Sequence, residues 1–208
     1  MLAYVIVAII AYAIGSISFS VIFSRKFAGF DVREKGSKNA GTTNVLRTVG
    51  KRVAALTLVC DISKGVIAVL IAMLVAHIWK DLDSGLLKYL AGFMAILGHT
   101  FPIFFEFRGG KGVATALGIL LTIAPKIGLI CLIFAIILMA ITKMVSVGSI
   151  LAAILFPILN IFIGKDNNFG TITISILIAL LVIFNHRKNI QRIKDGNENK
   201  LSFKKTEK

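Results

Sequence analysis

Acidic residues and cysteines are scarce in this sequence. Ten Asp and Glu stand against 24 Lys and Arg, which gives a formal net charge of +14. The two cysteines, Cys60 and Cys131, lie far apart within apolar segments and have no partner motif, so neither a disulfide framework nor a metal site is supported. The first residues lack the basic segment of a signal peptide, and we expect them to form a membrane helix that is retained.

Apolar side chains, in contrast, are abundant. Hydrophobic residues make up 57% of the chain and its mean hydropathy is +0.87, which excludes an ordinary soluble domain. In a soluble protein the positive charge would suggest a nucleic-acid partner. Here the basic residues collect in a few polar segments, as the positive-inside rule predicts for a membrane protein. No aromatic or groove-reading element accompanies them, so no nucleic-acid partner is expected.

Several apolar runs reach the length of about 20 residues that a helix needs to cross a bilayer. The sequence therefore predicts an all-α, polytopic membrane protein with about seven transmembrane helices. The predicted spans are Leu2–Phe23, Val53–Ile78, Leu86–Phe105, Val113–Ala124, Ile127–Thr142, Val145–Ile163 and Phe169–Phe184. The fourth span is short and Pro125 separates it from the fifth. These two could instead form a re-entrant hairpin, which would leave five crossings.

The distribution of charge predicts the orientation of the chain. Arg25–Arg52 and the segment after Asn185 are rich in Lys and Arg, whereas the loop Trp79–Ser84 is nearly neutral. With either number of crossings this predicts an N-terminus outside and a C-terminus in the cytoplasm. Residues 1–194 are predicted to form one integral membrane domain, followed by a polar, loose cytoplasmic tail, 195–208.

Two charges lie inside the second predicted span. Asp61 and Lys64 are three residues apart, on one face of the helix, where they can pair. Charges at membrane depth cost about 2.5–3.5 kcal/mol each on insertion scales, so they normally face protein or water. We expect a neutralised pair that fastens this helix to a neighbour rather than a catalytic pair.

Three polar stretches fall on one face of the predicted membrane protein. The first, Gly36–Arg47, reads GSKNAGTTNVLR and is dense in neutral hydrogen-bonding groups. Such groups suit a ligand rich in oxygen atoms, and Arg47 can bind a phosphate through two parallel hydrogen bonds. The alternative is ordinary turn chemistry, since Asn, Ser, Thr and Gly are also turn residues.

The second stretch, Gly98–Gly112, carries His99, Arg108 and Lys111 among several glycines. A glycine-rich backbone can expose its N–H groups to an anion, most plausibly a phosphate. The stretch is no nucleotide P-loop, because Gly112 stands where such a loop has Ser or Thr. The alternatives are a short basic membrane turn, and for His99 a helix-end histidine satisfied by a backbone carbonyl.

The third stretch, Asn185–Arg192, begins where the last span ends. If the helix continues, His186, Asn189 and Arg192 share one face. Alone, such a segment is typical of a basic anchor that contacts anionic headgroups. Beside the other two stretches it becomes a candidate third wall of a binding site.

Together these motifs resemble a known family. GSKNAGTTNVLR with the downstream DISKG, then GHTFPIFFEFRGGKGVAT and NHRKNIQRIKDGNENK, are similar to the motifs of the bacterial acyl-phosphate:glycerol-3-phosphate acyltransferase family, in the same order and over nearly the whole chain. The resemblance implies a multi-pass enzyme of the bacterial cytoplasmic membrane with its active site at the cytoplasmic face.

The implied reaction is the first acylation of phospholipid synthesis. A fatty acyl group moves from acyl phosphate to the 1-hydroxyl of glycerol 3-phosphate, which yields lysophosphatidic acid and phosphate. The implied partners are these substrates, membrane lipid and, as a candidate, the soluble enzyme that supplies acyl phosphate. No cofactor and no metal are implied.

The resemblance also implies roles for single residues. The catalytic set would be His99, Ser37, Arg47 and Lys111. The residues expected to bind substrate are Asn39, Asn44, Arg108, Gly109, Gly110, Ser146, His186 and Asn189. We expect His99 near the attacking hydroxyl, as an orienting partner or a general base, although an anionic substrate phosphate could take the proton instead. An apolar groove for the acyl chain is expected after Gly112, beside Phe101–Phe107.

Other functions fit less well. The His-x4-Asp motif of soluble-type glycerolipid acyltransferases is absent, because Leu82, Phe104 and Gln191 occupy the Asp position after the three histidines. The clustered aspartates of CDP-alcohol phosphatidyltransferases are also missing. A small transporter for an anionic metabolite is the alternative function, and it would predict polar groups throughout the membrane depth.

Overall fold

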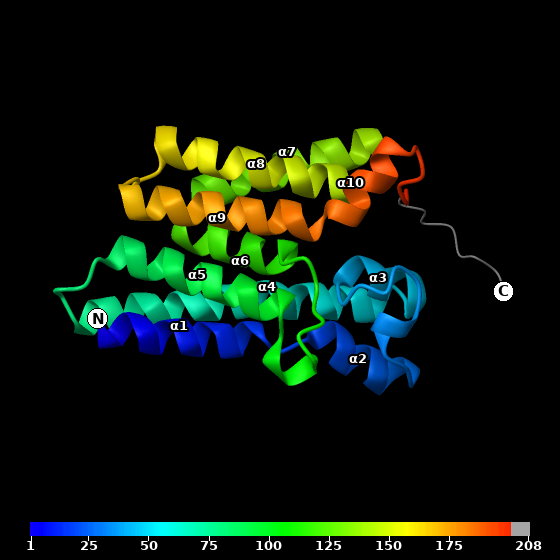
Figure 1. Ribbon diagram of the computed structural model, residues 1–208, viewed down its shortest axis with the longest axis horizontal. Helices are drawn as coiled ribbons and strands as arrows, with labels where there is room; N and C mark the ends of the chain where they lie inside the picture. Colours follow the sequence, from blue (N-terminus) through cyan, green and yellow to red (C-terminus); the bar gives the residue numbers. More distant parts are fainter. Residues whose placement is uncertain (201–208) are drawn as a thin grey trace.

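The computed structural model describes residues 1–200 of the chain. Over these residues the secondary structure consists of helices joined by short loops (Figure 1). The α-helices are α1 (Leu2–Gly15), α2 (Phe19–Ala28), α3 (Thr42–Thr48), α4 (Lys51–Ile78), α5 (Ser84–Thr100), α6 (Val113–Ile123), α7 (Pro125–Thr142), α8 (Val145–Ile163), α9 (Phe169–Asn185) and α10 (Arg187–Lys194). Two short 3-10 helices are η1 (Val32–Glu34) and η2 (Ile103–Phe105).

The long helices form two layers that run roughly along one direction (Figure 1). Helices α1, α4 and α5 make one layer, α7, α8 and α9 make the other, and α6 lies between them. Five segments are long and apolar enough to cross a membrane, and α9 with α10, bent by 56°, would be a sixth. The prediction of an all-α, polytopic membrane protein is therefore confirmed.

Small residues bring the helices of the first layer into backbone contact. A Cβ at Gly15 of α1 would collide with the Ala95 carbonyl of α5, and one at Gly98 of α5 would collide with the Tyr12 carbonyl of α1. Membrane helices gain little from burying apolar surface, so close packing of small residues is a main source of their association. Because α1 lies against α5, the loop that follows α5 is held at a fixed position.

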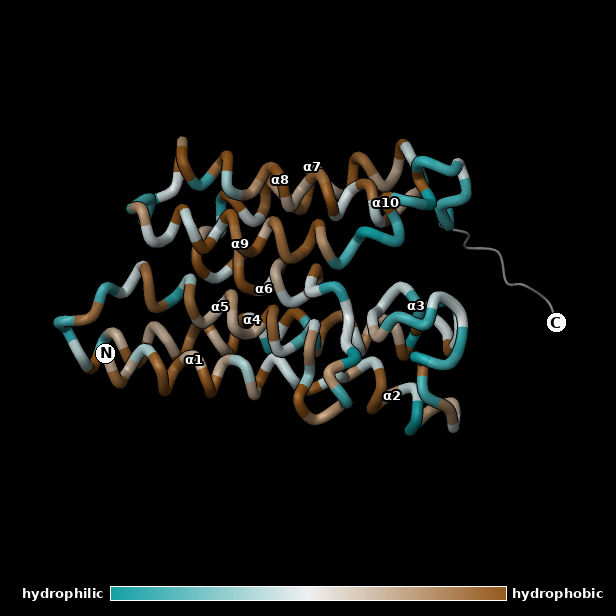
Figure 2. The backbone as a smooth tube through the Cα atoms, in the orientation of Figure 1, coloured by the Kyte–Doolittle hydropathy of each residue, from teal (hydrophilic) through white to brown (hydrophobic). Residues whose placement is uncertain are grey.

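The outer surface of the helices is strongly apolar, as lipid contact requires. Large side chains such as Ile9, Leu74, Ile137 and Phe162 are exposed, and Figure 2 shows that the helices are mostly hydrophobic while hydrophilic segments gather at one end. That end holds α2, α3, α10 and the loop before α6.

The first predicted span is not one continuous helix. Helix α1 ends at Gly15 and α2 begins at Phe19, so the break falls within the predicted segment Leu2–Phe23. The buried Lys64 of α4 donates a hydrogen bond to the Ile17 carbonyl, 2.9 Å away, which the break leaves without a helical partner. Non-helical backbone at this depth needs such a partner, because no water is there to supply one.

The middle pair of predicted spans is a short helix and a long one. Helix α6 has 11 residues, about 16 Å in length, against a hydrocarbon core of about 30 Å. Helix α7 has 18 residues and Pro125 is its first residue, where the missing N–H of proline costs nothing. Proline thus begins α7, and residues 1–200 contain seven apolar helices, of which α6 is too short to cross a membrane alone.

Candidate active site

The three polar stretches meet at one end of the bundle, around a cavity of about 250 Å³. Ser37 and Asn39 come from the loop before α3, Gly109–Lys111 from the loop before α6, and Asn189 and Arg192 from α10. Lys38, Arg187 and Lys188 also line it, and the lining residues include no carboxylate in the described part of the chain. The shared location of the stretches was predicted, and the wall they form is suited to a small anion.

Asn44 organises the first wall from behind. Its side chain is buried and donates hydrogen bonds to the carbonyls of Val32, Lys35 and Asn39, while its oxygen accepts one from the Ser37 backbone N–H. These partners lie in η1 and in the loop between η1 and α3. Asn44 therefore holds Ser37 and Asn39 at the cavity and does not line it.

The glycine-rich loop forms the second wall, but not by exposing the N–H groups of its glycines to an anion, as was expected from the sequence. The Gly109 and Gly110 N–H groups donate to the Thr100 and His99 carbonyls at the end of α5, so they are not available to an anion. Glycine is needed here for close approach, because a Cβ at Gly110 would collide with His99 Nε2 and the Ala40 carbonyl. The loop offers a bare backbone surface and the Lys111 side chain.

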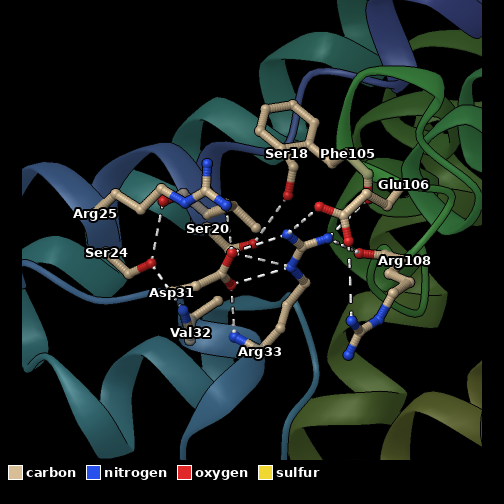
Figure 3. Close-up of polar contacts among 11 residues, drawn as sticks. Ser18, Ser20, Ser24, Arg25, Asp31, Val32, Arg33, Phe105, Glu106 and Arg108 are labelled. Carbon is tan, nitrogen blue, oxygen red and sulfur yellow. Dashed lines mark hydrogen bonds and ion pairs between the residues drawn. The ribbon is translucent and has the colours of Figure 1, made fainter.

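A buried guanidinium ties the first loop to the second (Figure 3). Arg33 pairs with Asp31 through Nε and Nη2, at 3.0 and 2.8 Å, and its Nη1 donates to the Phe105 carbonyl at 2.7 Å. Burial alone would raise the pKa of Asp31, but hydrogen bonds from Arg33 and Arg25 outweigh it and lower this pKa to about 2. The pair thus stays ionised at neutral pH and holds the two walls together.

The third wall is held by a carboxylate from the end of the described chain. Glu198 is buried and accepts hydrogen bonds from Asn189 Nδ2 at 2.6 Å, Ser146 Oγ at 2.8 Å and Arg192 Nε at 2.8 Å. Burial opposes the ionisation of Glu198, but these hydrogen bonds lower its pKa below the ordinary value. Glu198 therefore brings the start of the predicted loose tail, 195–208, back onto the site, and residues 201–208 of that tail lie outside the described residues.

Lys111 joins the second wall to the third. Its Nζ donates to Asn189 Oδ1 at 2.6 Å. Burial lowers the pKa of Lys111 to about 8, since desolvation penalises the ammonium and the nearby Arg192 and Arg47 add to the effect, while Glu198 opposes it. An anion in the cavity would restore the lost stabilisation of this charge.

His99 lies directly behind the glycine-rich loop. The imidazole is buried, with Nδ1 3.3 Å from Thr115 Oγ1 and 3.7 Å from Asp61 Oδ1. Nε2 lies next to Gly110, so this is the nitrogen turned toward the cavity wall. The Lys64 ammonium is 3.1 Å from the same Asp61 oxygen. The expected pair of charges in α4 exists, and it also reaches His99.

Besides Asn44 and His99, four other predicted site residues do not line the cavity. Arg108 is exposed and lies 3.9 Å from Glu106 (Figure 3). Arg47 lies near Glu198 and Arg192 without a hydrogen bond to either among residues 1–200, Ser146 contacts Glu198, and His186 is buried with Nδ1 2.7 Å from the Val182 carbonyl. The loop of the predicted acyl groove exposes large side chains, namely Phe101, Ile103, Phe104 and Phe107.

No role was predicted from the sequence for three residues that hold the site together, namely Asp31, Arg33 and Glu198. Each is one residue of an otherwise basic or polar segment, and no spacing singles it out. One sequence feature could have indicated the acidic residues among them. An acidic residue is rare in a segment where the positive-inside rule favours Lys and Arg, and its carboxylate requires a cationic or hydrogen-bonding partner nearby. Within residues 1–200 no group of three metal-ligating side chains occurs.

Comparisons with known proteins agree on one family. The family model described as "Glycerol-3-phosphate acyltransferase" matches residues 5–196. The glycerol-3-phosphate acyltransferase of Clostridioides difficile (strain 630) is 44% identical over 203 residues, 98% of each chain. That of Thermoanaerobacter sp. (strain X514) is 42% identical over 200 residues, 96% of each chain.

Two solved structures share this fold. The glycerol 3-phosphate form of PlsY, an integral membrane glycerol 3-phosphate acyltransferase, superimposes with a TM-score of 0.86 at 34% identity over 96% of both chains. Its lysophosphatidic acid form gives 0.83 at 32% identity over 96% of this chain and 95% of that one.

Proposed function

The chain belongs to the glycerol-3-phosphate acyltransferase family, and on that premise we propose that its cationic cavity binds glycerol 3-phosphate and that the acyl donor is an acyl phosphate. The protein is an integral membrane acyltransferase. The observation that supports the proposed site most directly is the convergence of three polar segments on one cavity lined by cations.

The cavity chemistry suits the acceptor. Lys111, Arg192 and Lys188 line one small space with the neutral side chains of Ser37 and Asn39, so cations can hold a phosphate while amide and hydroxyl groups bind the glycerol oxygens. We propose that Lys111 and Asn189 bind the acceptor phosphate and that Ser37 and Asn39 bind beside it. Arg47, at the edge of this group, would meet the second phosphate.

An acyl phosphate is a mixed anhydride whose carbonyl carbon is already activated. The alcohol oxygen of glycerol 3-phosphate forms a bond to this carbon, the bond from carbon to the phosphate oxygen breaks, and phosphate leaves with the electron pair. The enzyme then needs chiefly to position the two reactants and to stabilise the charge that moves onto phosphate. Lys111 and Arg47 would supply that stabilisation.

The proton of the alcohol needs an acceptor. We propose that His99 orients the acceptor hydroxyl through Nε2, the nitrogen beside Gly110, and that a phosphate oxygen of the substrates takes the proton. His99→Gln should then retain more activity than His99→Ala, since glutamine can still form a hydrogen bond but cannot act as a base. Equal loss in the two variants would assign the proton to His99 itself.

We further propose that the cavity faces the cytoplasm, with the N-terminus outside. Lys and Arg are concentrated in the segments around the cavity, which supports this orientation. Labelling with a membrane-impermeant maleimide in intact cells would test it, because Lys80→Cys should react and Lys188→Cys should not. The reverse pattern would place the cavity outside.

The assay that tests the donor uses purified protein with palmitoyl phosphate and glycerol 3-phosphate, and measures lysophosphatidic acid and phosphate. We expect both products only when both substrates are present, and little acylation from palmitoyl-CoA. Lys111→Ala should abolish most of the activity, with Arg108→Ala as the matched control outside the cavity. Equal use of palmitoyl-CoA would overturn the donor, and phosphate release without glycerol 3-phosphate would overturn the acceptor.

The transporter alternative finds little support. The named relatives and both solved structures are acyltransferases, and the cations that line the candidate cavity lie together at one end of the bundle.

A further inference from the structure

A second cavity, of about 300 Å³, lies at the end of the bundle opposite the candidate site. Its walls come from α5, from the junction of α6 and α7, and from the end of α8. Nothing in the proposed reaction uses it. Its volume is at the lower end of the range of ligand pockets, about 300–1,000 Å³.

The short helix α6 creates this cavity. Ile123, the last residue of α6, and Pro125, the first of α7, lie around the same space as Tyr89, which is already inside α5, and Ile163, the end of α8. The junction is therefore set back from the end of the bundle, and Figure 1 shows α6 ending short of the neighbouring helices. A membrane surface at this end would place lipid over the recess.

The recess has apolar walls and a cationic rim. Ile123, Ile127 and Ile163 line it, and Lys126 and Lys165 stand exposed at its edge. Neither lysine forms an ion pair within residues 1–200. Asp166, the one carboxylate that the described chain contributes to the lining, is already paired with Lys88 at 2.7 Å.

This combination matches the chemistry of a charged lipid better than that of a soluble anion. Two unpaired ammonium groups attract a phosphate at the membrane surface, while the isoleucines offer contact to a hydrocarbon chain that enters the recess beneath it. A free phosphate would leave the apolar walls without a partner.

We propose that this recess binds one anionic phospholipid, with the headgroup phosphate between Lys126 and Lys165 and part of an acyl chain against Ile123, Ile127 and Ile163. The site is separate from the active site, and its existence does not depend on the proposed donor or acceptor. The lipid would fill the gap that α6 leaves between α5 and α8.

Native mass spectrometry of the full-length protein in detergent tests this proposal. The protein is titrated with phosphatidylglycerol and with phosphatidylcholine of the same acyl chains, and the bound fraction is measured. Each lysine near an anionic phosphate contributes about fivefold in affinity, so we expect the preference for phosphatidylglycerol to fall by up to about 25-fold in the double variant Lys126→Gln/Lys165→Gln.

The double variant Lys80→Gln/Lys143→Gln removes two exposed lysines elsewhere and serves as the matched control, with the preference unchanged. Acyltransferase activity and melting temperature report whether either variant is damaged. The water-soluble glycerophosphoglycerol headgroup should not bind. Equal retention of the two lipids by the unmodified protein, an unchanged preference in Lys126→Gln/Lys165→Gln, binding of the headgroup alone, or occupation of the recess by a second copy of the chain would each overturn the proposal.

Discussion

Two buried ion-pair clusters lie beside the candidate cavity, one around Asp31 and Arg33 and one around Asp61 and Lys64. They differ in how completely the carboxylate of each is hydrogen-bonded. In the first, Asp31 accepts hydrogen bonds from the side chains of Arg33 and Arg25 and from the Arg33 backbone. In the second, Asp61 Oδ1 is buried without a well-directed hydrogen bond, although Lys64 and His99 lie close to it.

The difference indicates that one cluster has a structural role and the other an electrostatic role. A fully hydrogen-bonded ion pair between loops rigidifies the backbone on which it lies. A buried carboxylate with spare capacity retains a strong field and acts on its neighbours, here His99 behind the glycine-rich loop. We infer that the Asp31–Arg33 cluster builds the cavity wall and that the Asp61–Lys64 pair orients the imidazole.

Removing Arg33 should produce the largest effect. Arg33→Ala leaves Asp31 buried without its main partner and frees the Phe105 carbonyl, which costs about 3–5 kcal/mol of folding free energy. Thermal unfolding in detergent should show a large fall in melting temperature, with activity lost as well. Arg25→Ala is the control, since this arginine also contacts Asp31 but is exposed and should cost at most about 1 kcal/mol. Similar melting temperatures for the two variants would contradict the comparison.

Asp61→Asn should lower both the rate of catalysis and the melting temperature, because it leaves the buried Lys64 without its carboxylate. The amide keeps the shape of the side chain, but His99 loses the carboxylate that faces its Nδ1. A catalytic group that is slightly misplaced can cost about 10²-fold in rate, so we expect kcat to fall by about that factor with a small change in KM.

The double variant Asp61→Asn/Lys64→Gln separates the two roles of Asp61. It removes both buried charges and should restore the melting temperature, while kcat stays low because His99 still lacks its carboxylate. Recovery of kcat together with the melting temperature would show that Asp61 serves only to neutralise Lys64.

Alkaline pH should distinguish the cavity from the first cluster. Asp31, with a pKa of about 2, stays ionised, whereas Lys111 of the free enzyme, with a pKa of about 8, loses its proton as the pH rises through that value. Since the ammonium form binds phosphate, KM for glycerol 3-phosphate should rise about tenfold between pH 7 and pH 9. Lys111→Arg should flatten this rise, because arginine stays charged. The same pH dependence in Lys111→Arg would exclude Lys111 as its source.

Arg108→Ala should have the smallest effect. The side chain is exposed and outside the cavity, while the backbone around it is held by Arg33. We expect kcat/KM within about twofold of the unmodified protein, as for most exposed charges. A tenfold loss would mean that Arg108 binds a substrate phosphate, as the sequence suggested.

Most of the fold could be predicted from the sequence because the apolar runs are long. The predicted span Val145–Ile163 matches α8, and the predicted second span differs from α4 by only two residues at its start. The break at Ser16–Ser18 could not be predicted, since it depends on Lys64 reaching the Ile17 carbonyl from another helix.

The candidate site was predictable in its location and less so in its details. The positive-inside rule predicted that the three polar stretches lie on one face of the membrane. Sequence alone could not distinguish residues that line the cavity from residues that support it. Asn44 and Asn39 look alike in a sequence stretch rich in turn-forming residues, yet Asn44 lies in α3 and hydrogen-bonds to backbone groups, whereas Asn39 lines the cavity.

The position of Glu198 has a consequence for the order of events during synthesis. This residue leaves the ribosome after the rest of the site, and within residues 1–200 no other side chain accepts hydrogen bonds from Asn189, Ser146 and Arg192 together. At about 5–20 residues per second, the helices have time to enter the membrane before the cavity can close. The active site is therefore completed only after the C-terminal segment has been synthesised. A nascent chain halted before residue 198 should be inserted in the membrane yet inactive.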